Sequence, residues 1–537
     1  MAKQLKINNW NKYLYVGEHQ SISLNYLLGL VSLMALIAGY WRFFELNIYI
    51  NFIFLPIAVL VLANKLITLF FGIIYPSFNL TEHKNYCKEF NENFTQSRKP
   101  PSVDVFLPIA GESLDVLRET WIGVKNLDYP DYNVYVLDDS NNEDIKLMSV
   151  EFDFYYLARP NRGVNKKAGN LQYGFQHSDG EHILILDADF VPHSDFLRES
   201  IPYMQNQKIG ILQTPQYFPM SEEINNRSLI EYGAGAMVED FYRIIMPCRD
   251  KLGGAMCVGT SALYRRSALN LINGFPQVEH SEDIKTGLNL SSINYQIKYL
   301  PVILSRGRCP DNLESYIKQQ IRWCHGALET LFSMSIYKAK IPLSGKLAYL
   351  GSGIFYLSEA FSIILSLQVF FLVFLYPSSI TLIGATLFLP FIFYNYFLEN
   401  HKKLFADNLS VIIVGVTQNF TFLYAIFSFF LKKPSQWMPA GLKQKSQTVS
   451  KEVRIVIQMI LSYSFFYVGL VISKLVLDPG FFININHFGI VLWLIFSSGI
   501  LIISSTYILQ FLLPNLSKAG LKSQSWDSKK YKQETNV

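Results

Sequence analysis

Charged residues are few in this chain. Aspartate, glutamate, lysine and arginine make up 17% of its 537 residues, whereas hydrophobic residues make up 50%. Soluble domains carry about 25% charged residues, so we expect much of the chain to lie in lipid. The net charge of +5 is modest, and the polar middle of the chain has no basic stripe. Because such a stripe marks nucleic-acid-binding proteins, we expect no nucleic-acid partner.

Cysteine is also scarce. The number of cysteines is odd, and their spacing does not match the paired spacing of a metal site, so they are expected to be reduced thiols in a cytosolic setting. A cleavable signal peptide is not evident, because a second long apolar stretch follows the first. The cysteines are Cys87, Cys248, Cys257, Cys309 and Cys324.

Long apolar runs are what the chain has in quantity. A helix needs about 20 apolar residues to cross a bilayer. The run at 409–431 is interrupted by Gln418, Asn419 and Thr421 and followed by lysines, so we predict that it lies in the membrane interface. Six other runs predict spans, at 27–44, 48–74, 360–376, 380–398, 453–476 and 488–512.

Lysine and arginine gather at 402–454 and 518–532, whereas the opposite loops are poor in both. Because cytoplasmic loops carry this excess, six spans place both termini and the polar region in the cytoplasm, and the protein in the plasma membrane. A seventh span would put the tail outside.

The predicted parts are 1–84 with two spans, 85–346 as a cytoplasmic domain, 347–513 with interfacial helices, a gating-like loop and four spans, and 514–537 as a basic tail.

Short apolar runs alternate with helix-like stretches inside the polar region. VDVFLP, YNVYVLDD, FYYLA, HILILDAD and IGILQTP are typical of buried strands. Several end in acidic or polar residues, which is where an open α/β sheet places its ligand. The pattern indicates a nucleotide-binding architecture, by analogy of fold.

The run HILILDADF delivers two aspartates, Asp187 and Asp189, at the end of a predicted strand. Alternation along an extended chain puts both carboxylates on one side, where they could hold a divalent cation against a diphosphate. A pair of turn or cap aspartates is the alternative.

Three further groups of residues favour the same chemistry. Asp138 and Asp139 could accept hydrogen bonds from a base or ribose, unless they form a turn. Lys167, beside Lys166, could neutralise the charge of a phosphate group. The alternative is that both lysines only extend into solvent. Asp283, after Glu282, could deprotonate an attacking hydroxyl, unless Ser281 only caps a helix.

A predicted helix before the third span carries KQQIRWCHG. Arg322 could pair with a pyrophosphate, and Trp323 offers a flat face to a sugar ring. Anchoring at the membrane interface is the alternative for the indole.

In chain order these motifs resemble the processive family-two glycosyltransferases, above all bacterial cellulose synthase catalytic subunits. VDVFLPIAGE, KKAGN, QTPQYF and VGTSALYRR are similar too, and the resemblance covers roughly 25–475. The residues that match the family pattern D, D-x-D, T-E-D and Q-x-x-R-W are Asp139, Asp187, Asp189, Ser281, Glu282, Asp283, Gln319, Arg322 and Trp323.

This resemblance implies a GT-A-type α/β domain inserted in an all-α multi-pass membrane domain. The implied reaction is an inverting single displacement from a UDP-sugar. The implied catalytic residues are Asp283, as the base, and Glu282, and Asp187 and Asp189 hold Mg²⁺ or Mn²⁺. The implied donor-binding residues are Glu112, Asp138, Asp139, Lys167, Asp187, Asp189, Gln319, Arg322 and Trp323. The implied acceptor-binding residues are Trp323, Gln213, Thr214, Pro215, Thr260 and Ser261.

The chain departs from the family pattern in three places. Ser281 replaces a threonine, and the segment QWMPAGLKQ, with Trp437 and Lys443, lacks the Val-Thr pair of the family's gating loop. The chain also ends soon after Leu512, so we expect no PilZ domain and no in-chain control by cyclic-di-GMP.

Three functional readings follow. The first is a processive synthase of a β-linked polysaccharide, with glucose as the favoured sugar and an export subunit as a possible partner. The second is a transferase that adds one sugar to a lipid carrier, and the third is an inactive membrane scaffold. Two ionisable residues, Lys65 and Glu359, lie in or beside apolar runs. We expect Lys65 to snorkel toward the membrane surface and Glu359 to belong to an interfacial helix at the mouth of a channel.

Overall fold

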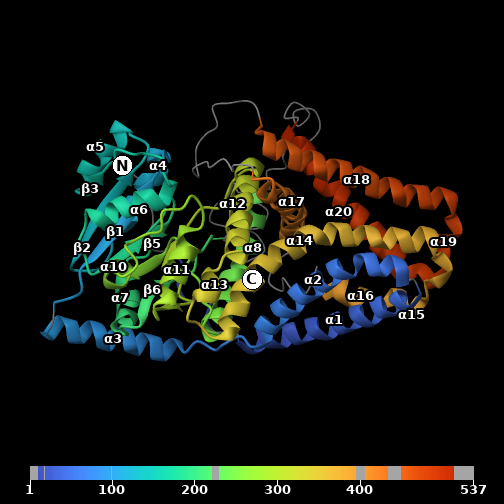
Figure 1. Ribbon diagram of the computed structural model, residues 1–537, viewed down its shortest axis with the longest axis horizontal. Helices are drawn as coiled ribbons and strands as arrows, with labels where there is room; N and C mark the ends of the chain where they lie inside the picture. Colours follow the sequence, from blue (N-terminus) through green and yellow to red (C-terminus); the bar gives the residue numbers. More distant parts are fainter. Residues whose placement is uncertain are drawn as a thin grey trace, which may run out of the picture.

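The chain folds into an α/β region and a set of long helices that extend away from it (Figure 1). The computed structural model describes residues 10–16, 19–46, 48–97, 99–219, 229–394, 405–432 and 449–512. The α/β region occupies the left of Figure 1, and the long helices lie side by side on the right.

A seven-stranded mixed sheet forms the centre of the α/β region, in the order β3-β2-β1-β4-β7-β6-β8. Neighbouring strands are parallel except where β7 pairs with β4 and β6. The five predicted strands are confirmed, whereas β7 and β8 were not predicted. The strands are β1 (Val103–Ile109), β2 (Tyr132–Asp138), β3 (Tyr155–Leu157), β4 (His182–Ile185), β6 (Ile209–Gln213), β7 (Ala262–Arg265) and β8 (Gln296–Tyr299).

Helices cover both faces of this sheet, which is why the central strands are buried along their length and mostly apolar. All seven residues of β1 are buried. On one face Trp121 of α4 is fully buried against Phe152 and Phe154. The helices of the region are α4 (Leu114–Lys125), α5 (Glu143–Phe152), α6 (Lys166–Gln176), α7 (Phe196–Ser200), η1 (Ile201–Gln205), α8 (Leu229–Asp240), η2 (Phe241–Ile245), α9 (Met246–Lys251), α10 (Arg266–Asn270), α11 (Glu282–Ser292), α12 (Leu313–Leu331) and α13 (Ser335–Lys338).

Among the described residues, six helices are long and apolar enough to cross a membrane. They are α1 (His19–Leu46), α2 (Ile48–Ile73), α14 (Leu343–Leu375), α17 (Phe405–Phe430), α18 (Lys451–Leu477) and α20 (Phe488–Leu512). Shorter helices connect them: η3 (Pro377–Ser379), α15 (Leu382–Thr386), α16 (Leu389–Phe393), α19 (Pro479–Ile483) and η5 (Ile485–His487).

These six helices differ from the six predicted spans. The described part of the predicted span at 380–398 forms α15 and α16, separated by a turn, and a continuous span there stays a prediction. The predicted span at 360–376 is the second half of α14, a helix of 33 residues that starts beside the α/β region. Helix α17 has the length of a span but packs against α8, α12 and α14, so its interfacial placement stays a prediction.

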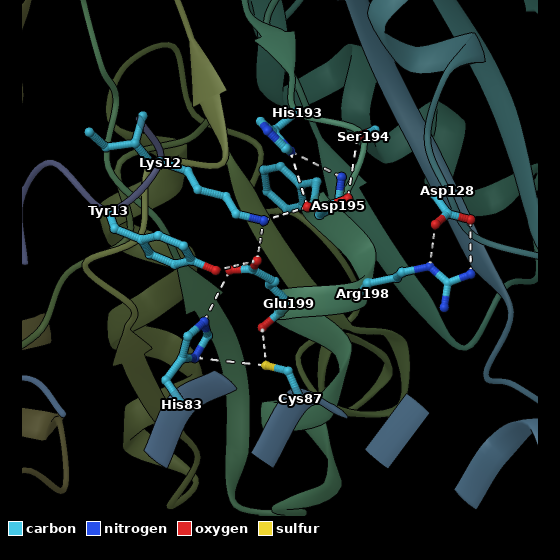
Figure 2. Close-up of polar contacts among 12 residues, drawn as sticks. Lys12, Tyr13, His83, Cys87, Asp128, His193, Ser194, Asp195, Arg198 and Glu199 are labelled. Carbon is cyan, nitrogen blue, oxygen red and sulfur yellow. Dashed lines mark hydrogen bonds and ion pairs between the residues drawn. The ribbon is translucent and has the colours of Figure 1, made fainter. Parts of the chain in front are cut away.

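The N-terminal segment and α3 (Leu80–Ser97) are attached to the α/β region by a polar network around Glu199. Figure 2 shows Lys12, Tyr13 and His83 converging on this carboxylate. The hydroxyl of Tyr13 donates to Glu199 Oε1 at 2.9 Å, and His83 Nε2 lies 3.0 Å from Oε2. Nearby, Trp10 donates to the carbonyl of Ile303 at 3.1 Å. Residues that precede the first apolar helix therefore pack on the α/β region.

Candidate active site

A cavity of about 980 Å³ opens where β1, β2 and β4 end and continues between the long helices. It collects most of the residues that the sequence singled out, although these lie far apart along the chain. The predicted residues that line it are Glu112, Asp139, Lys167, Asp187, Asp189, Glu282, Asp283, Gln319, Arg322 and Trp323.

The D-x-D pair follows β4 and is fixed by its neighbours. The backbone N–H of Asp187 donates to Thr260 Oγ1 at 2.8 Å, and Lys167 Nζ donates to Asp187 Oδ1 at 2.5 Å. Burial acts to lower the pKa of Lys167, but the carboxylates of Asp187, Glu282 and Asp283 raise it above its ordinary value. Lys167 therefore carries its charge beside the acidic groups.

Asp189 is buried beside two other carboxylates. Burial, together with the charges of Asp187 and Glu112, raises the pKa of Asp189 to about 7. Such a concentration of carboxylates suits a divalent cation. The part of the chain that the structure describes has no group of three His, Cys, Asp or Glu ligands. Two carboxylates fit Mg²⁺, which proteins commonly hold by one or two carboxylates together with substrate phosphates.

The two aspartates at the end of β2 have different surroundings. Asp138 is fully buried and accepts hydrogen bonds from Ser140 and from the hydroxyl of Tyr156, at 2.6–2.7 Å. Asp139 faces the cavity and accepts two hydrogen bonds from the guanidinium of Arg159. Asp138 therefore stabilises the loop, whereas Asp139 is available to a ligand.

Arg159 was not among the predicted residues. It is 1% exposed and holds the loop through Asp139 and the carbonyls of Val164 and Lys166. Its place directly after a strand, in YYLARP, is the signal that could have identified it.

Asp283 lies in the first turn of α11, against the loop that contains Gly259. A Cβ added at Gly259 would lie 2.9 Å from Asp283 Oδ2, and the φ of +83° also favours glycine there. Burial, and then the charge of Glu282, raise the pKa of Asp283 to about 7, opposed by the N–H of Ile284 and by Lys167. A carboxylate with this pKa can take a proton near neutral pH.

Helix α12 presents Gln319, Arg322 and Trp323 to the cavity, because residues three and four apart share one face of a helix. Burial lowers the pKa of Arg322, and the carboxylates of Asp187 and Glu282 oppose this change. Arg322 therefore lies close to two of the acidic motifs. A Cβ added at Gly326 would lie 1.8 Å from the hydroxyl of Ser281, so α12 packs tightly on the loop before Asp283.

The predicted acceptor-binding residues of the segments QTPQYF and VGTSALYRR do not line the cavity. Their polar groups bond to one another: Gln213 donates to the carbonyl of Thr260 at 2.8 Å, and Thr214 donates to that of Ser261 at 2.9 Å. Gln216 and Val258, close to them in the chain, line the cavity instead. Contact of Gln213, Thr214, Pro215, Thr260 and Ser261 with an acceptor stays a prediction. The segment QWMPAGLKQ lies outside the described residues.

The cavity continues from Trp323 to polar residues on the long helices. The side chains of Gln320 and Gln418 join α12 to α17 at 3.3 Å. Both Lys65 and Glu359 line the cavity, and Glu359 lies in the middle of α14. The other polar lining residues on α2, α14 and α17 are Asn64 and Thr68 of α2, Tyr349, Ser352 and Tyr356 of α14, and Asn419 of α17.

Residues 182–398 match the family model described as glycosyl transferase family group 2. This part of the chain is similar to the family 2 glycosyltransferases. It contains Asp187, Asp189, Asp283 and Arg322, so the predicted resemblance is confirmed where the carboxylates and the Q-x-x-R-W motif lie.

Two proteins similar to this chain are cellulose synthase catalytic subunits described as UDP-forming. That of Komagataeibacter xylinus is 32% identical over 261 residues, which are 48% of this chain and 34% of the relative. That of Pseudomonas fluorescens is 30% identical over 289 residues, which are 52% of this chain and 37% of the relative. The chain thus spans little more than a third of the length of these relatives.

Similar folds occur among solved glycosyltransferases. A mannosyltransferase of Pyrobaculum calidifontis, in complex with GDP-Man and Mn²⁺, is 14% identical, with a TM-score of 0.44 over 70% of this chain and all of its own. S. aureus TarS 1–349, in complex with UDP-GlcNAc, has a TM-score of 0.33 over 65% of this chain and 98% of its own. Both similarities are weak.

Proposed function

We propose that this protein is a processive, inverting membrane glycosyltransferase. It polymerises a β-linked polysaccharide from a UDP-sugar on the cytoplasmic side and passes the product across the membrane. The observation that carries the proposal is the single cavity that runs from Asp187, Asp189 and Asp283 to polar residues of α2, α14 and α17. The polar side chains along this continuation suit a hydrated polysaccharide, whereas a lipid acceptor would need an apolar groove.

In this proposal the donor occupies the end of the cavity near the sheet, within a GT-A-type domain. Asp139, held by Arg159, accepts hydrogen bonds from the nucleoside, and Lys167 and Arg322 contact the diphosphate side. Asp187 and Asp189 hold Mg²⁺ or Mn²⁺, which neutralises diphosphate charge when bound. The relatives are described as UDP-forming cellulose synthases, so UDP-glucose is the favoured donor.

The chemistry is a single displacement. The end of the growing chain stacks on Trp323, and Asp283 takes the proton from its attacking hydroxyl. The hydroxyl oxygen forms a bond to the anomeric carbon as the bond to the diphosphate breaks, and UDP leaves from the opposite face. The configuration is therefore inverted, and no sugar becomes attached to the enzyme. The longer polymer then advances toward Tyr356 and Glu359.

The test is synthesis by the purified protein in nanodiscs, with Mg²⁺ and radiolabelled UDP-glucose or UDP-GlcNAc in separate reactions. The readout is label in high-molecular-weight polymer, followed by digestion with linkage-specific glycosidases. We expect polymer from one donor and a loss of at least about 10²-fold in Asp283→Asn. Asp153→Asn is the matched control, because Asp153 is exposed and lies outside the cavity.

Each outcome has a distinct meaning. Label that appears only in a short lipid-linked product would contradict processivity and favour the lipid-carrier reading. Full activity in Asp283→Asn would contradict the assignment of the base. No product from either donor, with folded protein, would contradict the proposed donor class.

A further inference from the structure

Two guanidinium groups share one carboxylate at the mouth of the cavity. Arg306 donates to Glu119 Oε1 at 3.3 Å, and Arg308 donates to Glu119 Oε2. One negative charge therefore faces two positive charges, so the group carries a net positive charge at the edge of the donor site.

The two arginines are not equivalent. Arg306 lies in β9 (Ser305–Arg306), paired with β5 (Val191–Pro192), and its guanidinium is 5.3 Å from the ring of Trp10. Its side chain is 24% exposed, whereas that of Arg308 is 56% exposed. Arg308 lines the cavity and Arg306 does not. The excess positive charge is thus available to a ligand at Arg308.

The backbone fixes Arg308 beside the D-x-D pair. The N–H of Gly307 donates to the carbonyl of Tyr217 at 2.8 Å. A Cβ added at Gly307 would lie 2.4 Å from the ring of Phe190, which directly follows Asp189. Arg308 is also the cation that opposes the rise in the pKa of Asp189.

We propose that Arg308 binds an anionic group of the sugar-nucleotide donor, exchanging part of its contact with Glu119 for that group. This inference rests on the proposed function and adds a donor-binding residue outside the D, D-x-D, T-E-D and Q-x-x-R-W motifs. A guanidinium pairs equally well with phosphate and with carboxylate oxygens. The anionic group is therefore either the diphosphate or the carboxylate of a uronic acid sugar.

The experiment measures the dissociation constants of UDP, UDP-glucose and UDP-glucuronic acid by calorimetry at saturating Mg²⁺. The proteins are the full chain, Arg308→Gln and the matched control Arg306→Gln, which removes the other guanidinium from the same carboxylate. Tm is recorded for each protein to show that it is folded.

If the diphosphate is the partner, Arg308→Gln weakens all three ligands about tenfold, as expected for loss of a charge-assisted hydrogen bond. If the sugar carboxylate is the partner, the same variant weakens only UDP-glucuronic acid. Arg306→Gln changes affinity less than twofold in either case.

Two results would overturn the inference alone: affinities of Arg308→Gln equal to those of the unaltered chain, or equal losses in Arg306→Gln and Arg308→Gln. Failure of the unaltered chain to bind any of the three ligands would overturn the proposed function together with the inference.

Discussion

Three carboxyl groups at the donor end of the cavity have pKa values raised to about 7: Glu112, Asp189 and Asp283. Burial is the largest cause for each, and neighbouring carboxylates add to it. A bound cation would favour the ionised forms of Asp187 and Asp189. In the proposed mechanism, the protonation state of Asp283, beside Glu282 and Lys167, decides whether the acceptor hydroxyl can be deprotonated.

This gives a pH prediction. Because the ionised form of Asp283 is the proposed base, a raised pKa means that activity should be lost as pH falls through about 7. At saturating Mg²⁺, we expect the rate of polymer synthesis to fall about tenfold per pH unit below that value. The affinity for UDP, measured at the same Mg²⁺ concentration, should change less. A rate that is constant from pH 5.5 to 8 would contradict the role of Asp283.

At the scale of elements, Glu199 of α7 connects the segment before α1 to α3. Burial alone would raise its pKa, but hydrogen bonds from His83, Lys12 and Tyr13 lower it to about 2 from an ordinary value of 4.5. The ionised carboxylate therefore stabilises the folded state at pH values above about 4.5. This contribution is lost as pH falls toward 2.

We expect Glu199→Gln to destabilise the protein on the order of 3 kcal/mol at neutral pH, at about 1.36 kcal/mol per pKa unit. Its Tm should be lower than that of the unaltered chain at pH 7, and this difference should shrink as pH falls from about 5 to 3. Glu92→Gln is the control, because Glu92 of α3 is exposed. An unchanged Tm at pH 7 would show that the network does not hold these elements together.

At the scale of the whole molecule, the α/β region is joined to α14 through the loop after α9. The hydroxyl of Ser344 donates to the carbonyl of Leu252, and that of Tyr349 to the carbonyl of Ala255, both at 2.9 Å. A Cβ added at Gly345 would lie 2.6 Å from the carbonyl oxygen of Gly253. The α/β region, where the donor is proposed to bind, and the helix that lines the rest of the cavity are therefore in backbone contact.

Gly345→Ala should force this contact apart, because a backbone atom cannot move as a flexible side chain can. We expect a lower Tm and shorter polymer, with UDP affinity affected less because the donor residues lie on the sheet side. Gly469→Ala is the control, since nothing lies within 4 Å of a Cβ at Gly469 of α18. Unchanged Tm and polymer length in Gly345→Ala would contradict the proposed coupling.

The sequence by itself determined the features that depend on neighbouring residues. The mostly apolar runs VDVFLP and HILILD identified β1 and β4, because strands covered on both faces bury nearly all of their side chains. The acidic residues at strand ends indicated where the site lies, because the carboxyl ends of parallel strands meet at one edge of a sheet. These residues are Asp139, Asp187 and Asp189. The Q-x-x-R-W spacing placed Gln319, Arg322 and Trp323 on one helical face.

Only the tertiary structure decided which of these residues line the same cavity. Asp138 and Asp139 are identical in type, and their roles separate because Tyr156 and Ser140 bind one while Arg159 holds the other. The antiparallel pairing of β7, the break between α15 and α16, and the path of the cavity along α14 and α17 also arise from contacts between distant segments. Local hydrophobic pattern carries no information about such pairings, since they depend on packing and burial across the whole chain.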